Sequence, residues 1–461
     1  MKKIGIIILI LISGLYSETI HIPEDYSTIQ DGIDAASDGD EILVYPGTYY
    51  GPIDFHRKNL MLRSLFVLEG DESYISETII TSTDDPGFAS NPSPNFVEID
   101  GISEIEVELN GFTFQDIFLD LNNDAQFAAI INIQNASPKI INNHFKNSYI
   151  YAQDIESAVI RCNYSNSLIE NNKFSDLSIA LNYQLSGWIL STDSQLNIRN
   201  NTMENGYVGF SDPTGYIVSL NSENIIEYNT FQNVSMGYCY MCAAILILDG
   251  SNCLIRNNLI LNAGGDGYGA IAASESEYLS HNNTLVSNRG GYTSFSSNGM
   301  IYNDIIINNP YGWGTPIAAD EYSNIQISYS NIEGGYEGES NIDVNPLFND
   351  SENNDYSLNE YSLCIDSGIS DLDGDGIEDI INYYGVTPDM GAYEYMPNED
   401  IIIGDVNSDG ILNILDIVLM VDMVLSEQYS VVADVNADGA VNVLDVIVMV
   451  NILVGGLPFE Y

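Results

Sequence analysis

The chain of 461 residues has few basic residues. Lys and Arg together number 12 against 66 Asp and Glu, which gives a formal net charge of −54 at pH 7. Proteins that bind nucleic acid or anionic membranes present Lys and Arg to phosphate groups, so this balance argues against both partners. A polyanionic glycan would need locally gathered cations or bridging calcium ions. Solubility accounts for part of the acidity, and calcium ligation for another part.

Long apolar runs are also scarce. Lys2 and Lys3 precede an apolar run at residues 4–13, and small residues follow up to Ser17. This order is typical of a cleaved secretory signal, and the run is too short to span a membrane. We therefore expect residues 1–17 to be a signal peptide and the mature chain to begin near Glu18. The protein is then secreted or held at the cell surface, and it is not membrane-spanning.

Cysteine is present in a small, odd number. The five residues are Cys162, Cys239, Cys242, Cys253 and Cys364. An odd number in an exported protein leaves one thiol over. Cys239 and Cys242 form a Cys-x-x-Cys pair, but a zinc site needs four ligands and no His lies close in sequence. Buried thiols, or one disulfide, are therefore favoured over a metal site.

A short unit of strand, Asn corner and strand recurs along the chain. Residues 167–174, Ser-Leu-Ile-Glu-Asn-Asn-Lys-Phe, are one copy. The units are rich in β-branched residues and have no helical period, so they predict an all-β parallel β-solenoid. Asn tolerates a left-handed corner and stacks its amide on the next turn, a structural role. The corner residues are spaced by 29, 29, 28, 29, 25 and 20 positions: Asn143, Asn172, Asn201, Asn229, Asn258, Asn283 and Asn303.

A second family of strands precedes these corners, at residues 157–161, 188–191, 216–220, 243–248 and 270–273. The loops between turns vary in sequence, and such loops commonly build the binding face of a solenoid. Aromatic rings in and beside them suit the faces of sugar rings, although rings also pack beneath loops. The predicted substrate-binding rings are Tyr183, Trp188, Tyr216, Tyr240 and Tyr268.

The first turns have a helical cap and a protruding loop in this prediction. Ser27 with Gln30 forms a capping-box pattern, and Ile29, Ile33 and Ala36 then share one helical face. A short helix here would cover the unpaired strand edge at the open end. Residues 84–95 are rich in Pro, Ser, Asn and Asp, which predicts a loop.

Residues 18 to about 340 resemble the right-handed parallel β-helix superfamily, which includes pectate lyases, polygalacturonases and alginate lyases. The opening segment at residues 21–49 and the Asn-corner repeats carry the resemblance. It implies a right-handed parallel β-helix and a carbohydrate ligand, without fixing an activity. Residues 345–395 resemble a C-terminal segment of such exported proteins and are predicted to form the far cap of a domain over residues 18–395.

Inside that segment, residues 371–379 place carboxylates at alternate positions around Gly. Asp371, Asp373 and Asp375 would suit a further calcium ion. The alternative is an acidic surface turn. Residues 396–402, with Pro, Asn, Glu and Asp, predict a linker to a last module at residues 403–461.

Two copies of one loop open this module. Each has oxygen ligands at loop positions 1, 3, 5, 9 and 12, a backbone carbonyl at 7 and Gly at 6, which predicts one calcium ion per loop. Position 12 is Asp where an EF-hand has Glu. One helix follows each loop, at residues 416–426 and 445–454. The ligands are Asp405, Asn407, Asp409, Ile411, Asn413 and Asp416, then Asp434, Asn436, Asp438, Ala440, Asn442 and Asp445.

This loop pair is similar to a type I dockerin over residues 404–456. Dockerins bind cohesin domains on scaffold or surface proteins, so the resemblance implies a cohesin partner. It also implies that Ile414, Leu415, Val443 and Leu444 contribute to partner choice, although well-studied dockerins often have hydroxyl residues there. A module of about fifty residues cannot bury two helices that are apolar nearly all round. The helices therefore bind a partner or dock on the β-helix.

The sequence contains no complete catalytic set. Arg161 is the best candidate for the cation of a lyase. Asp193 and Asp249 follow equivalent strands, so they would lie about two turns apart, roughly the separation in an inverting hydrolase. Acidic turn residues are the alternative. Two functions remain: a secreted polysaccharide lyase or glycoside hydrolase tethered by its dockerin, and a non-catalytic adhesion or structural β-helix protein anchored in the same way.

Overall fold

The computed structural model describes residues 17–82, 95–101, 107–121, 127–152, 155–180, 184–209, 213–237, 239, 241–265, 268–309, 316–396, 403–407, 412–426, 428–436 and 439–453. Most of the predicted signal peptide, of the loop at 84–95 and of the linker at 396–402 lies outside these residues. The chain divides into two compact units. Unit 1 comprises residues 1–346 and 390–393, and unit 2 comprises residues 347–389 and 394–461.

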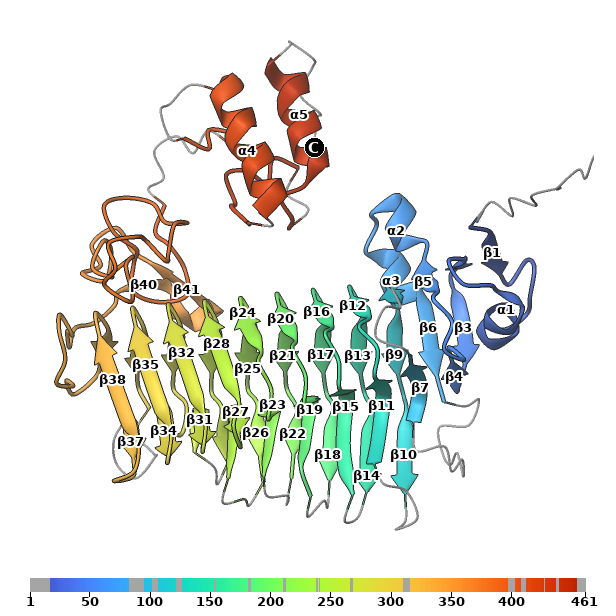
Figure 1. Ribbon diagram of the computed structural model, residues 1–461, viewed down its shortest axis with the longest axis horizontal. Helices are drawn as coiled ribbons and strands as arrows, with labels where there is room; N and C mark the ends of the chain where they lie inside the picture. The colour runs from blue at the N-terminus through green and yellow to red at the C-terminus, as the bar shows by residue number, and fades with distance from the viewer. Residues whose placement is uncertain are drawn as a thin grey trace, which may run out of the picture. The chain divides into compact units, whose positions relative to one another are not determined.

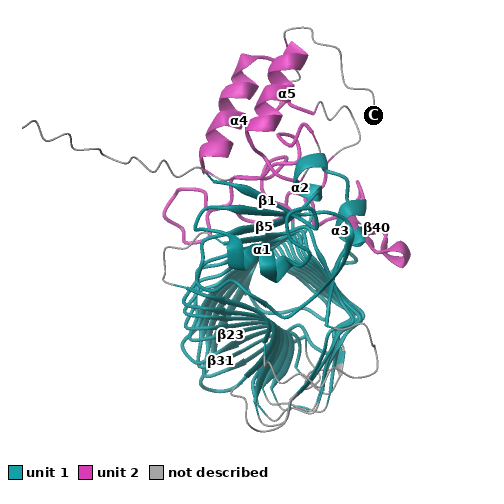
Figure 2. Cartoon of the chain, turned by 90° about the vertical axis from the view of Figure 1, so that its right-hand side faces the viewer, with its two compact units in different colours: residues 1–346, 390–393 teal, residues 347–389, 394–461 magenta. Residues whose placement is uncertain are grey.

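Unit 1 is a parallel β-solenoid, which confirms the predicted fold class (Figure 1). Its strands stack turn upon turn into four sheets, and neighbouring strands in each sheet run parallel. Figure 2 looks along the stack, with the sheets surrounding a common interior. We call the sheets A to D.

Sheets A and B meet at the Asn corners. Sheet A consists of β1 (Thr19–Ile22), β2 (Glu41–Val44), β5 (Met61–Ser64), β8 (Glu108–Asn110), β12 (Lys139–Ile141), β16 (Leu168–Glu170), β20 (Asn197–Arg199), β24 (Ile225–Glu227), β28 (Asn252–Arg256), β32 (Glu277–His281), β35 (Asn298–Tyr302) and β38 (Asn324–Ser328). Sheet B consists of β3 (Gly47–Tyr50), β6 (Thr78–Thr81), β9 (Thr113–Gln115), β13 (His144–Lys146), β17 (Lys173–Ser175), β21 (Thr202–Glu204), β25 (Thr230–Gln232), β29 (Leu259–Leu261), β33 (Thr284–Val286), β36 (Ile305–Ile307) and β39 (Asn331–Ile332).

Sheet C contains the second predicted strand family, in β15 to β31, and sheet D is made of short strands. Sheet C consists of β4 (Ile53–Asp54), β7 (Asn95–Asp100), β11 (Phe127–Gln134), β15 (Glu156–Asn163), β19 (Ser186–Thr192), β23 (Thr214–Leu220), β27 (Cys242–Leu248), β31 (Gly269–Ser274), β34 (Tyr292–Phe295) and β37 (Ile317–Ala319). Sheet D consists of β10 (Phe118–Leu121), β14 (Tyr149–Ala152), β18 (Ser178–Ala180), β22 (Tyr207–Val208), β26 (Ser235–Met236) and β30 (Gly264–Gly265).

The period of two along each strand sends alternate side chains into the solenoid. In sheet C, the register pairs one apolar residue of each turn with its counterpart on the next turn. The resulting inward row is fully or almost fully buried: Ile131, Ile160, Ile189, Ile217, Ile245 and Ile271. One hydrophobic cluster runs through the whole solenoid, because every turn adds its own layer to this core.

The Asn corners use two residues for two tasks. The first residue of each pair is left-handed, as at Asn171 with φ 55°, and the second supplies a buried amide. Asn143 Nδ2 donates to Asn172 Oδ1 at 3.2 Å, and Asn172 Nδ2 donates to Asn201 Oδ1 at 3.0 Å. The same bond continues through Asn229, Asn258 and Asn283. This confirms the predicted amide stack, while the left-handed conformation belongs to the neighbour.

The last predicted corner, Asn303, is wrong by one position. Asn303 has the left-handed conformation, φ 56°, and Asp304 takes the stacking position. The backbone N–H and Nδ2 of Asn283 both donate to Asp304 Oδ1, at 2.7 and 3.3 Å. The ladder of amides therefore ends in a buried carboxyl group.

A column of aromatic rings fills part of the core. Phe114, Phe145 and Phe174 stack with centroid distances of 5.1 and 4.9 Å, and Trp188 follows at 6.0 Å from Phe174. Tyr216 contacts Trp188 edge-on at 4.3 Å. Trp188 and Tyr216 are 0% exposed, so the prediction that they stack on sugars is wrong. Each ring directly precedes an inward residue, Ile189 or Ile217, and joins the same core, because the strand register skips these two positions and interrupts the alternation.

Helix α1 (Ile29–Ala35) packs against the first strands of the solenoid, and its Ile29 and Ile33 belong to the main core. The N-cap is Thr28, one residue after the predicted Ser27, and Thr28 Oγ1 accepts from the Asp31 N–H at 3.1 Å. Two short helices, α2 (Phe66–Glu69) and α3 (Ser73–Glu77), were not predicted. Their lengths are too short for a periodic pattern to develop.

Cys239 and Cys242 form a disulfide, one of the two alternatives that the sequence left open. Cys162, Cys253 and Cys364 are buried free thiols. Burial raises the pKa of Cys162 to about 12, which keeps this thiol protonated and unreactive.

Unit 2 contains the hairpin of β40 (Phe348–Asp350) and β41 (Asp355–Leu358), with a 3₁₀ turn at Ser351–Asn353 between them. Further along are helices α4 (Ile414–Ser426) and α5 (Val443–Leu453), each of which begins two residues before its predicted start. Met420, Met423, Ala433, Val435 and Met449 form the small core of this region. Within the described residues, no helix has the length and apolar character that crossing a membrane requires.

Candidate functional site: two calcium loops and an outer-face depression

The two predicted calcium loops have the same local structure. In the first loop, the N–H groups of Asn407 and Asn413 donate to Asp416 Oδ1 and Oδ2, at 3.2 and 2.8 Å. In the second loop, the N–H groups of Asn436 and Asn442 donate to Asp445 Oδ1 and Oδ2, again at 3.2 and 2.8 Å. The position-12 carboxylate thus fastens each loop to the start of its helix.

The position-1 carboxylate is held in the same way in the second loop. The N–H of Gly439 donates to Asp434 Oδ2 at 2.8 Å, and Gly439 is left-handed with φ 84°. Gly at this sixth position lets the loop turn back on itself around an ion. Three predicted ligands, Asp409, Ile411 and Asp438, lie outside the described residues.

The electrostatics of these loops call for a cation. Asp405 and Asp434 are 7% and 6% exposed, and Asp416 and Asp445 are 0% exposed. The sequence has no Lys, Arg or His after Arg289, so no basic side chain from this part of the chain can neutralise them. A buried, uncompensated carboxylate costs several kcal/mol. The donor set of carboxylate, amide and carbonyl oxygens fits Ca²⁺.

The helices that follow the loops expose apolar side chains. Val418 on α4 is 58% exposed and Ile447 on α5 is 50% exposed. The four residues predicted to contact a partner are more than half exposed: Ile414, Leu415, Val443 and Leu444. Such apolar exposure on a small module marks an interaction surface.

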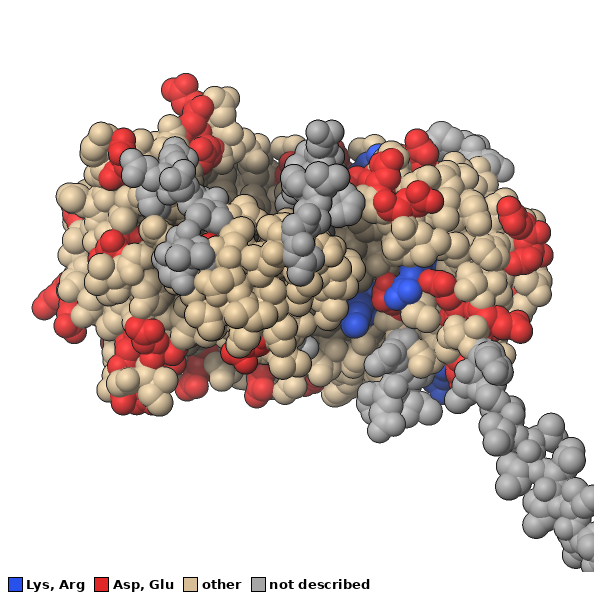
Figure 3. Space-filling model, turned by 90° about the horizontal axis from the view of Figure 1, so that it is seen from above, with Lys and Arg blue, Asp and Glu red and all other residues tan. Residues whose placement is uncertain are grey.

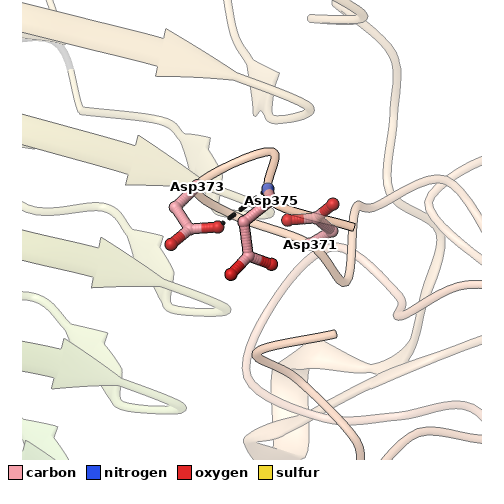
Figure 4. A group of neighbouring side chains, drawn as sticks. All are labelled: Asp371, Asp373 and Asp375. Atoms are coloured by element: carbon pink, nitrogen blue, oxygen red, sulfur yellow. Dashed lines mark hydrogen bonds between the residues drawn. The ribbon is translucent and has the colours of Figure 1, made fainter. Parts of the chain in front are cut away.

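The acidic turn at Asp371, Asp373 and Asp375 brings three carboxylates together. One oxygen of each lies within 4.8 Å of the others (Figure 4). Asp371 Oδ1 accepts from the Gly374 N–H at 2.8 Å, and Asp373 Oδ1 accepts from the Asp375 N–H at 3.0 Å. Asp371 Oδ2 also accepts from the Gly376 N–H at 2.9 Å, so the backbone of the turn itself holds these carboxylates.

Arg161 lies in a depression on the outer face of sheet C. Its Nε donates to Glu156 Oε2 at 2.9 Å and its Nη1 donates to Asn132 Oδ1 at 3.1 Å, while the guanidinium carbon lies 4.1 Å from the centre of the Phe127 ring. Asn132 Nδ2 in turn donates to Glu98 Oε1 at 2.7 Å. Burial raises the pKa of Glu98, although bonds from Asn132 and Asn95 oppose the rise.

Arg161 was a candidate from sequence, but its neighbours were not. Glu98, Asn132 and Arg161 are register partners on β7, β11 and β15. Their alignment follows from the repeat, so aligning the turns strand by strand would have placed Asn132, 29 residues before Arg161, beside it. Glu98 is harder to find from the sequence, because it precedes its register partner Asn132 by 34 residues and not by the usual 28 or 29.

Asp193 and Asp249 occupy equivalent left-handed turn positions, with φ 47° and 43°, as Asn221 does between them. Asn221 Nδ2 donates to Asp193 Oδ1 at 2.5 Å. The backbone gives a structural reason for Asp here, since Asp tolerates this conformation. Of the remaining predicted aromatic residues, Tyr268 is partly buried 5.1 Å from Phe295, and Tyr183 and Tyr240 lie outside the described residues.

Basic side chains near the Asn corners are paired with carboxylates. Lys173 pairs with Glu204 at 2.9 Å, Arg199 with Glu170 at 2.6 Å and Arg256 with Glu227 at 2.6 Å. On the face shown in Figure 3, Asp and Glu are spread widely and Lys and Arg gather in few places. None of these pairs resembles a cation-lined groove for a polyanion.

Residues 403–454 match the family model of the dockerin type I domain, and domains of this type bind calcium. The two loops and both helices described above fall within the matched residues. No curated protein matches the chain in sequence.

Several solved β-helix enzymes are similar in fold. Pectate lyase Pel9A is 12% identical with a TM-score of 0.39, and the match covers 83% of this chain and 97% of that one. A PL6 alginate lyase in complex with a trisaccharide is 11% identical with a TM-score of 0.29, over 70% and 86%. Pectin methylesterase from carrot is 11% identical with a TM-score of 0.30, over 67% and 87%.

Proposed function

We propose that this protein is a secreted or surface-held, carbohydrate-directed β-solenoid that a calcium-loaded dockerin tethers to a cohesin-bearing partner. The pair of matched loops at residues 405–416 and 434–445 carries this proposal. Each loop buries two carboxylates in a stretch of chain without basic residues, inside the segment that matches a dockerin. The solenoid presents its outer face to glycan, and the last module sets where the protein is held.

The module binds two calcium ions, one per loop. Asp405, Asn407, Asn413 and Asp416 hold the first ion together with Asp409 and the carbonyl of Ile411. Asp434, Asn436, Asn442 and Asp445 hold the second together with Asp438 and the carbonyl of Ala440. Each ion neutralises the buried carboxylates and fixes the loop against its helix, so binding is coupled to folding of the module.

A third ion binds at the turn of Asp371, Asp373 and Asp375. One oxygen of each carboxylate lies within 4.8 Å of the other two, and the nearby sequence offers no cation to compensate them. This turn is open on one side, so water completes the coordination of the ion and its affinity is lower than in the two loops.

The exposed apolar side chains of α4 and α5 form the partner surface. Leu415 and Leu444 are equivalent positions, 29 residues apart, and each is 57% exposed. Burying them against a partner removes apolar area from water, which stabilises a complex by about 25 cal/mol per Å². The partner face is therefore apolar, where a hydroxyl-rich dockerin would select a polar one.

A non-catalytic role is the second candidate, and the bonding of Arg161 favours it. Arg161 is 7% exposed, and its guanidinium is paired with Glu156 and bonded to Asn132, which leaves little of its charge for a substrate carboxylate. Binding or surface adhesion needs no freed cation, whereas polysaccharide lyase or glycoside hydrolase activity would need a poised acid or base.

A panel of polysaccharides tests the carbohydrate part of the proposal. The full chain is incubated with neutral and uronate polymers, and binding, unsaturated products and reducing ends are measured with and without calcium. Binding to at least one polymer is expected. Turnover would assign an enzyme, binding without turnover would assign the second candidate, and no binding to any polymer would contradict a carbohydrate-directed function.

A further inference from the structure

The outer face of sheet C changes character along the solenoid. On β7, β11 and β15, one outward row is Glu98, Asn132 and Arg161, and a second outward row is Asp100, Gln134 and Asn163. On the next turns, the first row continues with Leu190 and Val218, which are 0% exposed, and the second row continues with Thr192, Leu220 and Leu248. The polar site therefore borders a buried apolar cluster on the same side of sheet C.

Both cations at the polar site are already paired with carboxylates. Arg161 pairs with Glu156 at 2.9 Å, and Arg57 pairs with Asp100 at 2.6 Å. Glu98 has no cation and accepts from the side-chain amides of Asn95 and Asn132, at 2.5 and 2.7 Å. Three carboxylates thus face two cations, so an acidic sugar would meet surplus negative charge and would have to displace Glu156 from Arg161.

The remaining groups suit neutral hydroxyls. Asn163 Nδ2 donates to Gln134 Oε1 at 3.0 Å, so these two amides place donors and acceptors side by side on neighbouring strands. Strands repeat every 4.8 Å or so, close to the length of one sugar in an extended glycan.

We infer that the polar site of Glu98, Asn132, Gln134, Glu156, Arg161 and Asn163 binds a neutral glycan chain that crosses the strands of sheet C. The inference deepens the proposed function and rests on it. The amides of Gln134 and Asn163 bond the sugar hydroxyls, Asn132 holds Glu98 and Arg161 in place beneath them, and Arg161 with Glu156 forms a neutral pair that keeps uronates out.

Calorimetric titration of the full chain tests this assignment. The probes are neutral cello-, xylo- and manno-oligosaccharides, oligogalacturonate, oligoalginate and chitosan oligosaccharides. Binding of a neutral probe is expected, and Gln134→Ala with Asn163→Ala should weaken it about tenfold, as the loss of one or two hydrogen bonds would. Asn233→Ala is the matched control, because Asn233 bonds Asn205 in an exposed amide ladder elsewhere on the solenoid.

A second variant tests the charge argument. Glu156→Gln removes the charge that pairs with Arg161, so the ratio of uronate affinity to neutral-probe affinity should rise at least tenfold. If the wild-type chain prefers uronate or chitosan, and the Gln134/Asn163 variant loses that binding, the neutral class of glycan is overturned. The proposed carbohydrate-directed function is kept in that case. Neutral binding untouched in that variant would overturn the site, and absence of binding to every probe would overturn the proposed function as well.

Discussion

Asn283 donates two hydrogen bonds to Asp304 at the end of a ladder in which the earlier acceptors are asparagine side chains. Asp304 is 0% exposed and also accepts from the Tyr292 hydroxyl, which Ser280 contacts in turn. Burial raises the pKa of Asp304 to about 7. The solenoid thus carries a core carboxyl group with no cation among its described partners.

Asp304→Asn should stabilise unit 1 above neutral pH. The ordinary pKa is 3.8 and the folded value is about 7, so the unfolded chain loses this proton first as pH rises. Stability from this group is therefore fully present below about pH 4 and is lost as pH rises through 7. Thermal unfolding between pH 4 and 9 should show the variant gaining roughly 2–4 kcal/mol at pH 8 and little at pH 4.

Asn258→Asp is the matched control for this prediction. It places a carboxyl group at a buried position in the middle of the ladder, where Asn258 now bonds Asn283. This variant should lose stability over the same pH range in which Asp304→Asn gains it. Equal pH profiles for the two variants and the wild type would contradict the role given to Asp304.

Trp188→Ala should destabilise the solenoid and should have no separate effect on glycan binding. The ring is fully buried between Phe174 and Tyr216, so its truncation leaves a cavity and costs about 3–5 kcal/mol. Chemical denaturation measures this loss, and Trp188→Phe should show a smaller one. If the Trp188→Ala protein is as stable as the wild type but fails to bind glycan, the assignment of Trp188 to the core is contradicted.

Leu415→Glu combined with Leu444→Glu should abolish partner binding without releasing calcium. Both side chains are exposed, so the charges cost the module little stability but cannot enter an apolar interface. Calcium stoichiometry by calorimetry checks the loops. Leu68→Glu, at a 64% exposed leucine of α2, is the control. Partner affinity within twofold of wild type would refute the assigned surface.

Asp371→Asn with Asp373→Asn should lower the calcium stoichiometry of the full chain from three to two. The two dockerin loops lie elsewhere in the sequence and should keep their affinities. Glu352→Gln, an exposed acid of the same unit, is the control for loss of charge alone. A wild-type stoichiometry of two, unchanged in the variant, would show that this turn binds no calcium.

The sequence predicted features that repeat and missed features that occur once. The seven Asn corners predicted the solenoid, because the same pattern recurs in each turn. The two copies of one loop predicted the calcium-binding module. Asp304 was missed because this turn holds Asp, not Asn, at the ladder position, so the Asn before it was taken as the corner. Trp188 and Tyr216 were wrongly predicted to bind sugar. The sequence near a loop does not show whether the side chain of an aromatic residue points into the core or out to solvent.

The site around Arg161 shows the same limit. Its partner Glu156 lies five residues away on the same strand, yet Asn132 and Glu98 come from two earlier turns. Only the register across β7, β11 and β15 brings them together. Register depends on how neighbouring turns align. It cannot be predicted from the sequence where successive turns differ in length.

Calcium-dependent attachment through residues 403–454 is the central claim, and cohesin binding tests it most directly. The full chain is titrated against a panel of purified type I cohesin domains in calcium and in EGTA. We expect at least one cohesin to bind in calcium, no binding in EGTA, and none by Asp405→Ala with Asp434→Ala, whereas Asp422→Ala, at an exposed acid of α4, binds as wild type does. A double variant that retains both calcium ions and its cohesin, or a calcium-loaded chain that binds no cohesin, would contradict the account.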